Sequence, residues 1–246
     1  MESLMMTEGL AWLLLAAVLA GIVRGFSGFG TALVFLPVAA RFLDPFSAIT
    51  VLILMDLIGP LPNLPAAWRQ ATRADLLWLG LGLLVGLPAG IAVLAAGAPE
   101  LFRWAVSGVS LLMLVLLGFG WRYRGAMGRG MTFGTGFASG LLGGAAGVPG
   151  PPVILVYMAS ARPVAAIRAT ILVFLVLVDV TMLGMFAGAG RLVFGALGLG
   201  ALLAAPYLLA NVAGARAFRP ERAGLYRGAA YTIIAGSALS GLPLWG

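Results

Sequence analysis

The sequence predicts an all-α polytopic membrane protein with about ten hydrophobic segments in two inverted-topology repeats of five. Three observations support this fold class. Of 246 residues, 62% are apolar and 9% are charged, whereas about a quarter of the residues in a soluble domain are charged. The apolar residues form runs of the length that a hydrocarbon core of about 30 Å requires. Landmarks of the first half also recur in the second half.

The composition limits the chemistry that the protein can perform. The net charge of +7 is carried by arginines scattered between apolar runs, and a nucleic-acid binder would gather such charge in one patch. The chain has no histidine and no cysteine, which removes imidazole and thiolate chemistry and most transition-metal sites. We therefore expect no cofactor, no metal, no catalytic residue and no nucleic-acid partner.

Ten apolar segments follow one another along the chain. The first follows Glu2 and Glu8 in place of a positively charged region, so we interpret it as a retained helix and not as a cleaved leader. The second and seventh are too short to cross at 1.5 Å per residue, which predicts half-helices or arms of re-entrant hairpins. The predicted segments are 9–23, 30–43, 46–66, 75–97, 101–120, 131–146, 151–161, 165–189, 192–213 and 223–244.

The arginines predict the orientation in the membrane, because short cytoplasmic loops accumulate positive charge. In the orientation that fits best, both termini lie in the periplasm. Arg41, Arg103 and Arg191 are then the main arginines outside. The arginines placed inside are Arg69, Arg73, Arg122, Arg124, Arg129, Arg162, Arg168, Arg216, Arg219, Arg222 and Arg227.

Landmarks of residues 1–122 recur in residues 123–246 at an offset near 118, as in a duplicated transporter. With five segments in each half, the second copy enters the membrane from the opposite side. The whole chain is then one membrane domain made of repeat one, 1–122, and repeat two, 123–246. The matched residues are Gly21, Gly25 and Gly28 with Gly140, Gly144 and Gly147, Pro45, Ala48 and Pro88 with Pro163, Ala166 and Pro206, and Pro99-Glu100 with Pro220-Glu221.

Two glycine-rich breaks, 24–31 and 143–152, precede the two short segments. Proline favours the first turn of a helix, so Pro151 and Pro152 are expected to start the seventh segment. Non-helical backbone inside a bilayer must be buried in protein or line a watery cavity. Two converging helix N-termini form an anion site, since each carries unpaired N–H groups and about half a positive charge. Arg24 can hold an oxyanion bidentately. The predicted substrate-binding residues are Arg24, Ser27, Gly28, Gly30, Thr31, Gly147, Val148, Gly150, Arg168 and Thr170.

Each of these predictions has a structural alternative. Arg24 can extend to the membrane edge as a topology marker, and Arg168 can anchor an interface. The glycines of both breaks can serve close helix packing alone. Asn63 and Asn211 are secondary candidates, because polar residues in apolar runs more often bind a neighbouring helix than a substrate.

Asp56 and Asp179 lie near the middle of the third and eighth segments. An acid at this depth is costly and is therefore a candidate for function, so either carboxylate is a candidate for coupling a proton to anion transport. The alternative is a carboxylate that arginine or hydroxyl donors neutralise in order to lock helices together.

With these paired breaks, the helix starts at Pro45 and Pro163 and the repeated Pro-Glu loops, the sequence resembles the sulfite exporter TauE/SafE family along nearly the whole chain. The resemblance implies a permease that moves sulfur-containing anions such as sulfite or organosulfonates, usually outward, across the bacterial inner membrane. The chain departs from the expected pattern at Arg24, Phe26, Phe29 and Pro149, which leaves the identity and size of the anion open. The family's glycine-rich stretches fall on Gly25, Gly28, Gly30, Gly143, Gly144, Gly147 and Gly150.

Residues and resemblance together predict a secondary transporter that binds an anion at the midplane between the two repeats and moves it by alternating access. The expected partners are the anion and the lipid bilayer. The oligomeric state, including a homodimer, stays open. Three alternatives remain: a passive anion channel, an uptake permease for another oxyanion, and a membrane-embedded enzyme such as a lipid transferase.

Overall fold

The computed structural model describes residues 8–119, 127–158, 160, 162–219, 221 and 223–244. Within these ranges the regular structure consists of eleven α-helices and one short 3-10 helix, with no strand. This confirms the all-helical prediction. The expected roles of Glu2, Arg122, Arg124, Pro220 and Arg222, and the boundary between the two predicted repeats, lie outside the described residues.

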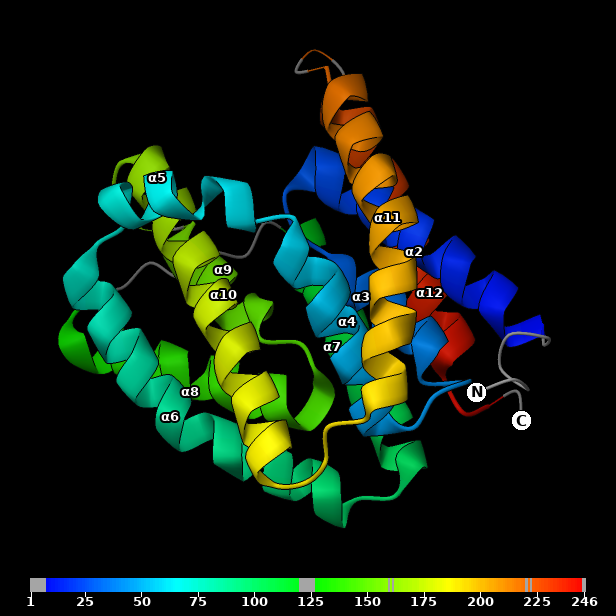
Figure 1. Ribbon diagram of the computed structural model, residues 1–246. Helices are drawn as coiled ribbons and strands as arrows, with labels where there is room; N and C mark the ends of the chain where they lie inside the picture. Colours follow the sequence, from blue (N-terminus) through cyan, green and yellow to red (C-terminus); the bar gives the residue numbers. More distant parts are fainter. Residues whose placement is uncertain are drawn as a thin grey trace. The chain divides into compact units, whose positions relative to one another are not determined.

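The helices group into two compact units (Figure 1). Unit 1 comprises the described parts of Met1–Ile58, Ala98–Gly118 and Leu192–Gly246, and unit 2 those of Gly59–Gly97 and Phe119–Arg191. Each unit therefore combines segments from both halves of the sequence. This division by contact differs from the predicted division by sequence repeat, which stays a prediction.

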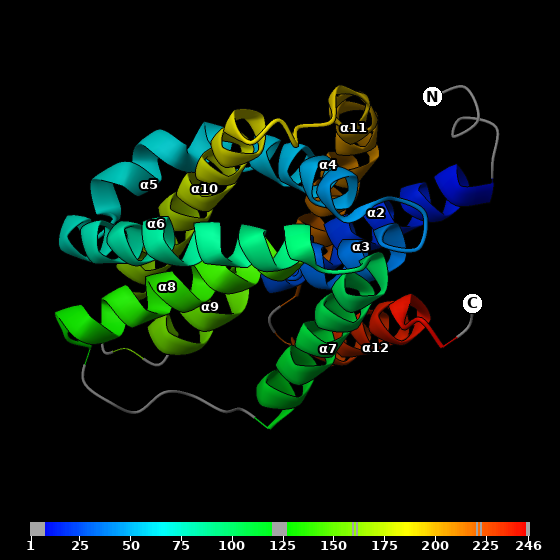
Figure 2. The same cartoon turned by 90° about the horizontal axis from the view of Figure 1, so that it is seen from below.

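Unit 1 is built around a short buried helix, α3. Val34, Phe35 and Leu36 of this helix are completely buried, and α2, α12, α7 and α4 all pack against it. Helices α7 and α12 lie side by side (Figure 2). The helices of unit 1 are α2 (Glu8–Ser27), α3 (Thr31–Ala39), α4 (Pro45–Ile58), α7 (Pro99–Gly118), α11 (Phe194–Ala217) and α12 (Ala223–Gly241).

Unit 2 contains the second short helix, α9, which packs against α8 and α10. Val153 and Tyr157 of α9 are completely buried. Exposed leucine and valine side chains such as Leu84, Val85 and Val93 of α6 are of the kind that suits contact with lipid. The elements of unit 2 are η1 (Leu61–Asn63), α5 (Leu64–Gln70), α6 (Arg73–Ala96), α8 (Arg129–Ala146), α9 (Gly150–Tyr157) and α10 (Val164–Gly188).

All ten predicted apolar segments are helical, and the third is divided into α4, η1 and α5. Fewer of them qualify as membrane spans than the count of ten segments suggests. Among the described residues, five helices are long and apolar enough to cross a membrane, namely α2, α6, α7, α10 and α11. Counting the bent pair Pro45–Ile58 and Leu61–Gln70 as one span raises the number to six. The chain is thus a multi-pass membrane protein.

Glycines make the closest helix contact in each unit. In unit 1, a Cβ at Gly21 or Gly25 of α2 would collide with α11, and in unit 2 a Cβ at Gly144 of α8 would lie 2.6 Å from the Ile91 nitrogen of α6. Only glycine lets backbones approach this closely. Gly21, Gly25, Gly140 and Gly144 therefore lie in close helix contacts, whereas a role of the break glycines in packing alone stays a prediction.

Both predicted breaks are present. Helix α2 ends at Ser27 and α3 begins at Thr31, with φ of 79° at Gly28 and 103° at Gly30. Helix α8 ends at Ala146, where Gly147 has φ of 67°, and α9 begins at Gly150. These left-handed conformations favour glycine, because a Cβ would clash with the backbone. Pro151 and Pro152 fall in the first turn of α9, as expected.

Candidate functional site

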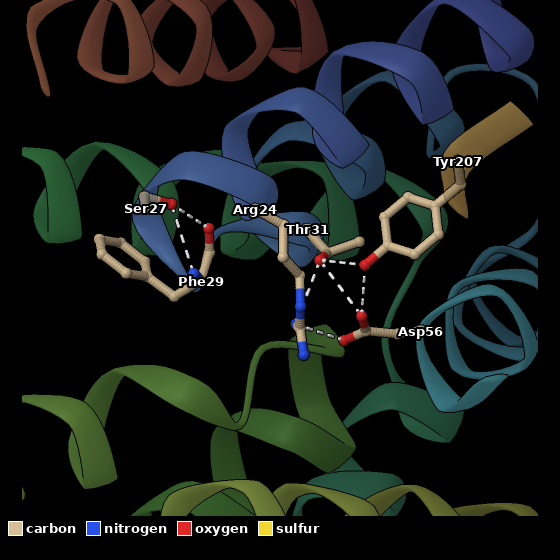
Figure 3. A network of polar contacts seen from close by, with 6 residues as sticks. All are labelled: Arg24, Ser27, Phe29, Thr31, Asp56 and Tyr207. Carbon is tan, nitrogen blue, oxygen red and sulfur yellow. Dashed lines mark hydrogen bonds and ion pairs between the residues drawn. The ribbon is translucent and has the colours of Figure 1, made fainter. Parts of the chain in front are cut away.

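The first break in unit 1 brings together four polar side chains from four helices (Figure 3). The Arg24 guanidinium of α2 donates from Nη1 to Oδ2 of Asp56 at 2.9 Å, in an ion pair with α4. The same nitrogen donates to the Thr31 hydroxyl of α3 at 3.2 Å. The Tyr207 hydroxyl of α11 donates to Asp56 Oδ1 at 2.8 Å.

The Thr31 hydroxyl connects the other three side chains. It lies 3.3 Å from Asp56 Oδ1 and 3.1 Å from the Tyr207 hydroxyl. Thr31 and Tyr207 are each 1% exposed, whereas the Arg24 and Asp56 side chains retain 20% and 21% exposure. The network therefore has a buried hydroxyl side and an accessible ionic side.

The N-terminus of α3 lies at this network, because Thr31 is its first residue. Val34 N donates to Gly30 O as the first amide of the helical pattern, and Gly30 provides no side-chain cap. The amides of Thr31, Ala32 and Leu33 therefore precede the first intrahelical bond. Because Thr31 itself contacts Asp56 and Arg24, the positive end of α3 lies at the ion pair.

Ser27 lies at the break but does not join the network. Its hydroxyl is within hydrogen-bond distance of Val23 O at 2.6 Å and Phe29 O at 2.7 Å, and it accepts a bond from Phe29 N at 3.3 Å. In Figure 3 it lies apart from Asp56 and the three residues around it. The local role of Ser27 is to hold the bend after α2.

The second break, in unit 2, has fewer backbone donors available. The Gly147 amide donates to Gly143 O at 2.8 Å and the Val148 amide to Leu142 O at 3.3 Å, which closes the C-terminus of α8. Proline has no N–H. Because positions 149, 151 and 152 are prolines, Gly150 has the one backbone N–H between Val148 and Val153. Anion binding by Gly147, Val148 and Gly150 stays a prediction that this geometry does not favour.

The remaining candidates are dispersed. Arg168 is exposed on α10, and buried Thr170 accepts a hydrogen bond from the Thr72 amide at the start of α6. Asp179 is half-buried in α10. Asn63 is exposed at the end of η1, while Asn211 lies on the face of α11 that packs against Gly25. The backbone of Asn211 thus lies against α2, and the role of its side chain stays a prediction.

A second ionic cluster, outside the predicted site residues, lies in unit 2. Arg162, before α10, donates from Nη2 to Asp75 Oδ1 at 2.9 Å and from Nη1 to the Thr72 hydroxyl at 3.2 Å. Tyr157 of α9 lies beside Asp75. Within the described ranges, the buried Tyr157 hydroxyl and Asp75 Oδ2 have no hydrogen-bond partner of good geometry.

Only part of this arrangement was detectable in the sequence. Tyr207 is 151 residues from Asp56, and its one signal is a polar ring tip in an apolar run directly after Pro206. Asp75 and Arg162 occur near the predicted ends of segments, where charged residues ordinarily mark the membrane edge. Their pairing is a product of the tertiary fold.

The site in unit 1 surrounds the carboxylate of Asp56 with hydrogen-bond donors. It contains one guanidinium, two hydroxyls and a helix N-terminus, all of which can donate to negatively charged oxygens.

No curated protein and no solved structure matches the chain. A match to the protein family described as sulfite exporter TauE/SafE covers residues 13–241. The chain belongs to this family of membrane transporters.

Proposed function

We propose that this protein is a secondary transporter that exports small sulfur-containing anions, such as sulfite or organosulfonates, across the bacterial inner membrane. Family membership supports the class of substrate. The five apolar helices of spanning length support a location in the bilayer. Both termini are proposed to lie in the periplasm, because of the arginine bias of the loops.

The observation that carries the proposal is the arginine at the break between α2 and α3. Arg24 lies in the last turn of a membrane-spanning helix and retains 20% exposure of its side chain. A charge at this place is costly and is ordinarily retained for function. Its guanidinium matches the paired oxygens of an oxyanion. The hydroxyls of Thr31 and Tyr207 lie within 3.3 Å of the Asp56 carboxylate, which Arg24 also binds.

The proposed binding group is Arg24, Thr31, Tyr207 and the first amides of α3. Gly28 and Gly30 allow the turn that brings the start of α3 to Arg24. Asp56 is proposed to couple the anion to a proton, and Asp179 stays a second candidate for that role. Arg168 and Thr170 are left out, since the first is exposed and the second bonds the start of α6.

Transport by the purified protein in vesicles tests the proposal. Proteoliposomes are loaded in turn with sulfite, sulfate, thiosulfate, sulfoacetate or taurine. Efflux is compared with that from protein-free vesicles that carry the same load. We expect rapid efflux of at least one sulfur-containing anion. The Arg24→Gln variant should lower that efflux about tenfold or more, because hydrogen bonds to a charged group contribute about 1.5–3 kcal/mol.

Arg41→Gln is the matched control. Arg41 is exposed after α3 and lies 5.7 Å from the centre of the Phe42 ring, so the variant removes the same charge from the same unit without touching the network. Its efflux should equal that of the unmodified protein. Absence of flux for every anion in the series, or turnover of a lipid by the purified protein, would refute the proposal.

A further inference from the structure

The donors that would hold a transported anion already hold a carboxylate. Asp56 Oδ2 accepts from Arg24 at 2.9 Å. Asp56 Oδ1 accepts from Tyr207 at 2.8 Å and has the Thr31 hydroxyl at 3.3 Å. One carboxylate from α4 thus collects donors from α2, α3 and α11, and each of its two oxygens has at least one.

A sulfonate or sulfite presents oxygens of the same charge and the same hydrogen-bonding character as a carboxylate. Thr31 and Tyr207 each have one hydroxyl proton to donate, and the Arg24 nitrogen nearest the site already contacts both Asp56 and Thr31. The same N–H and O–H groups cannot serve two anions at full strength. A substrate oxyanion in this position therefore has to displace Asp56.

The charge of the site leads to the same conclusion. Arg24 and Asp56 together carry no net charge, so an added anion leaves the site with an excess negative charge beside a carboxylate that has lost its cation. An uncompensated charge away from bulk water is costly. A proton on Asp56 restores neutrality. Among the described residues of unit 1, the charged and titratable groups in hydrogen-bond contact with Asp56 are Arg24 from α2 and Tyr207 from α11, and α3 contributes the uncharged Thr31.

We propose that Asp56 is an internal competitor of the transported anion: it occupies Arg24, Thr31 and Tyr207 until it takes up a proton, so that proton and anion bind together. The inference rests on the proposed function and adds the direction of the coupling between proton and anion. Proton and anion travel in the same direction. With a monoanion the pair is neutral, and with a dianion it carries one negative charge outward, which an inside-negative membrane potential favours.

Anion binding measured as a function of pH tests the direction of this coupling. The ligand is methanesulfonate, whose charge does not change between neutral and mildly acidic pH, and binding is measured by calorimetry on the purified protein. The affinity of the unmodified protein should rise by up to about tenfold for each unit by which the pH falls, as linkage to one proton requires. The Asp56→Asn variant should bind at neutral pH as tightly as the acidified protein, with no dependence on pH.

The matched control is Asp44→Asn, at the other end of the same helix. Asp44 is exposed and accepts a bond from the Ser47 amide at 3.1 Å, and asparagine caps a helix equally well. This variant should keep the pH dependence of the unmodified protein. Weaker binding by Asp56→Asn, or a pH dependence that persists in it, would overturn the inference.

Proton uptake gives a second measurement that needs no variant. Adding methanesulfonate to the unmodified protein in weak buffer should raise the pH, because the protein takes up about one proton for each anion that it binds. Binding without proton uptake would overturn the inference and leave the proposed function standing. If neither methanesulfonate nor any anion of the transport series binds at any pH, the proposed function itself fails.

Discussion

Among the described residues, each compact unit includes an arginine–aspartate pair with a separation of 2.9 Å, and the surroundings of these two pairs differ. In unit 1, Arg24 and Asp56 are about equally accessible, at 20% and 21%, and lie beside an open helix N-terminus. In unit 2, Asp75 is 9% exposed and joins the start of α6 to the segment before α10. The comparison shows that ion pairs of equal length can lie at an accessible helix break in one unit and beside a mostly buried carboxylate in the other.

The largest difference is expected in anion binding. Arg24→Gln removes the guanidinium of the proposed site and should weaken sulfite binding about 10- to 100-fold, the equivalent of about 1.5–3 kcal/mol for hydrogen bonds to a charged group. Arg162→Gln removes the same group from unit 2 and should leave affinity unchanged. Calorimetric titration of both variants checks this. Equal losses in the two would remove the functional distinction between the pairs.

The second difference is expected in stability, with the opposite order. Arg162→Gln leaves the mostly buried Asp75 without its cation, which should lower the free energy of unfolding by about 2 kcal/mol. Arg24→Gln should cost less, because Asp56 keeps Tyr207 and Thr31. Thermal melting in detergent measures both. The double variant Arg162→Gln with Asp75→Asn should recover part of the loss, and a double variant no more stable than the single would count against the ion pair as the cause.

The break in unit 1 should be sensitive to backbone strain. A Cβ at Gly28 meets open space, but its φ of 79° is a conformation that other residues seldom adopt. Gly28→Ala should therefore cost about 1–2 kcal/mol of stability. Gly184→Ala is the control, since Gly184 lies within α10 with nothing near its Cβ position, and alanine there should stabilise by up to about 1 kcal/mol. Melting temperatures of the two variants should move in opposite directions.

The smallest predicted difference concerns two buried tyrosines. Tyr207→Phe removes the 2.8 Å hydrogen bond to Asp56. It should lower the free energy of unfolding by about 1 kcal/mol and the anion affinity by about fivefold. Tyr157→Phe should be nearly neutral, because in the described part of the chain its hydroxyl has no partner of good geometry. Melting and titration of both variants decide this. A large loss from Tyr157→Phe would indicate that its hydroxyl bonds Asp75.

The sequence predicted the elements of the fold better than their assembly. The ten apolar runs, the two short helices and both glycine breaks were detectable because each depends on residues within a few positions of one another. Arg24 and Thr31 were detectable for the same reason, since they flank one break. The count of spans was less accurate, because helix length and hydropathy separate five spanning helices from the remainder.

Other features depend on which helices pack together. Gly21, Gly25, Gly140 and Gly144 were visible as a repeated pattern, but their role in the contacts between α2 and α11 and between α6 and α8 appears only in the structure. Each contact joins helices from different halves of the sequence. Gly147 and Val148 were predicted as anion donors for a different reason, because the local hydrogen bonds by which their amides close the end of α8 were not considered.

By itself, the sequence determined that the chain is a multi-pass helical membrane protein, where its helices break, and that an arginine lies at the first break. Those properties follow from local hydropathy and from the left-handed conformations that glycine permits. Only the tertiary structure decided that Arg24 faces Asp56 and that Tyr207, 151 residues from Asp56, completes the group. A hydrogen bond depends on the position of two atoms within a few tenths of an ångström, and helix packing sets that position between distant parts of the chain.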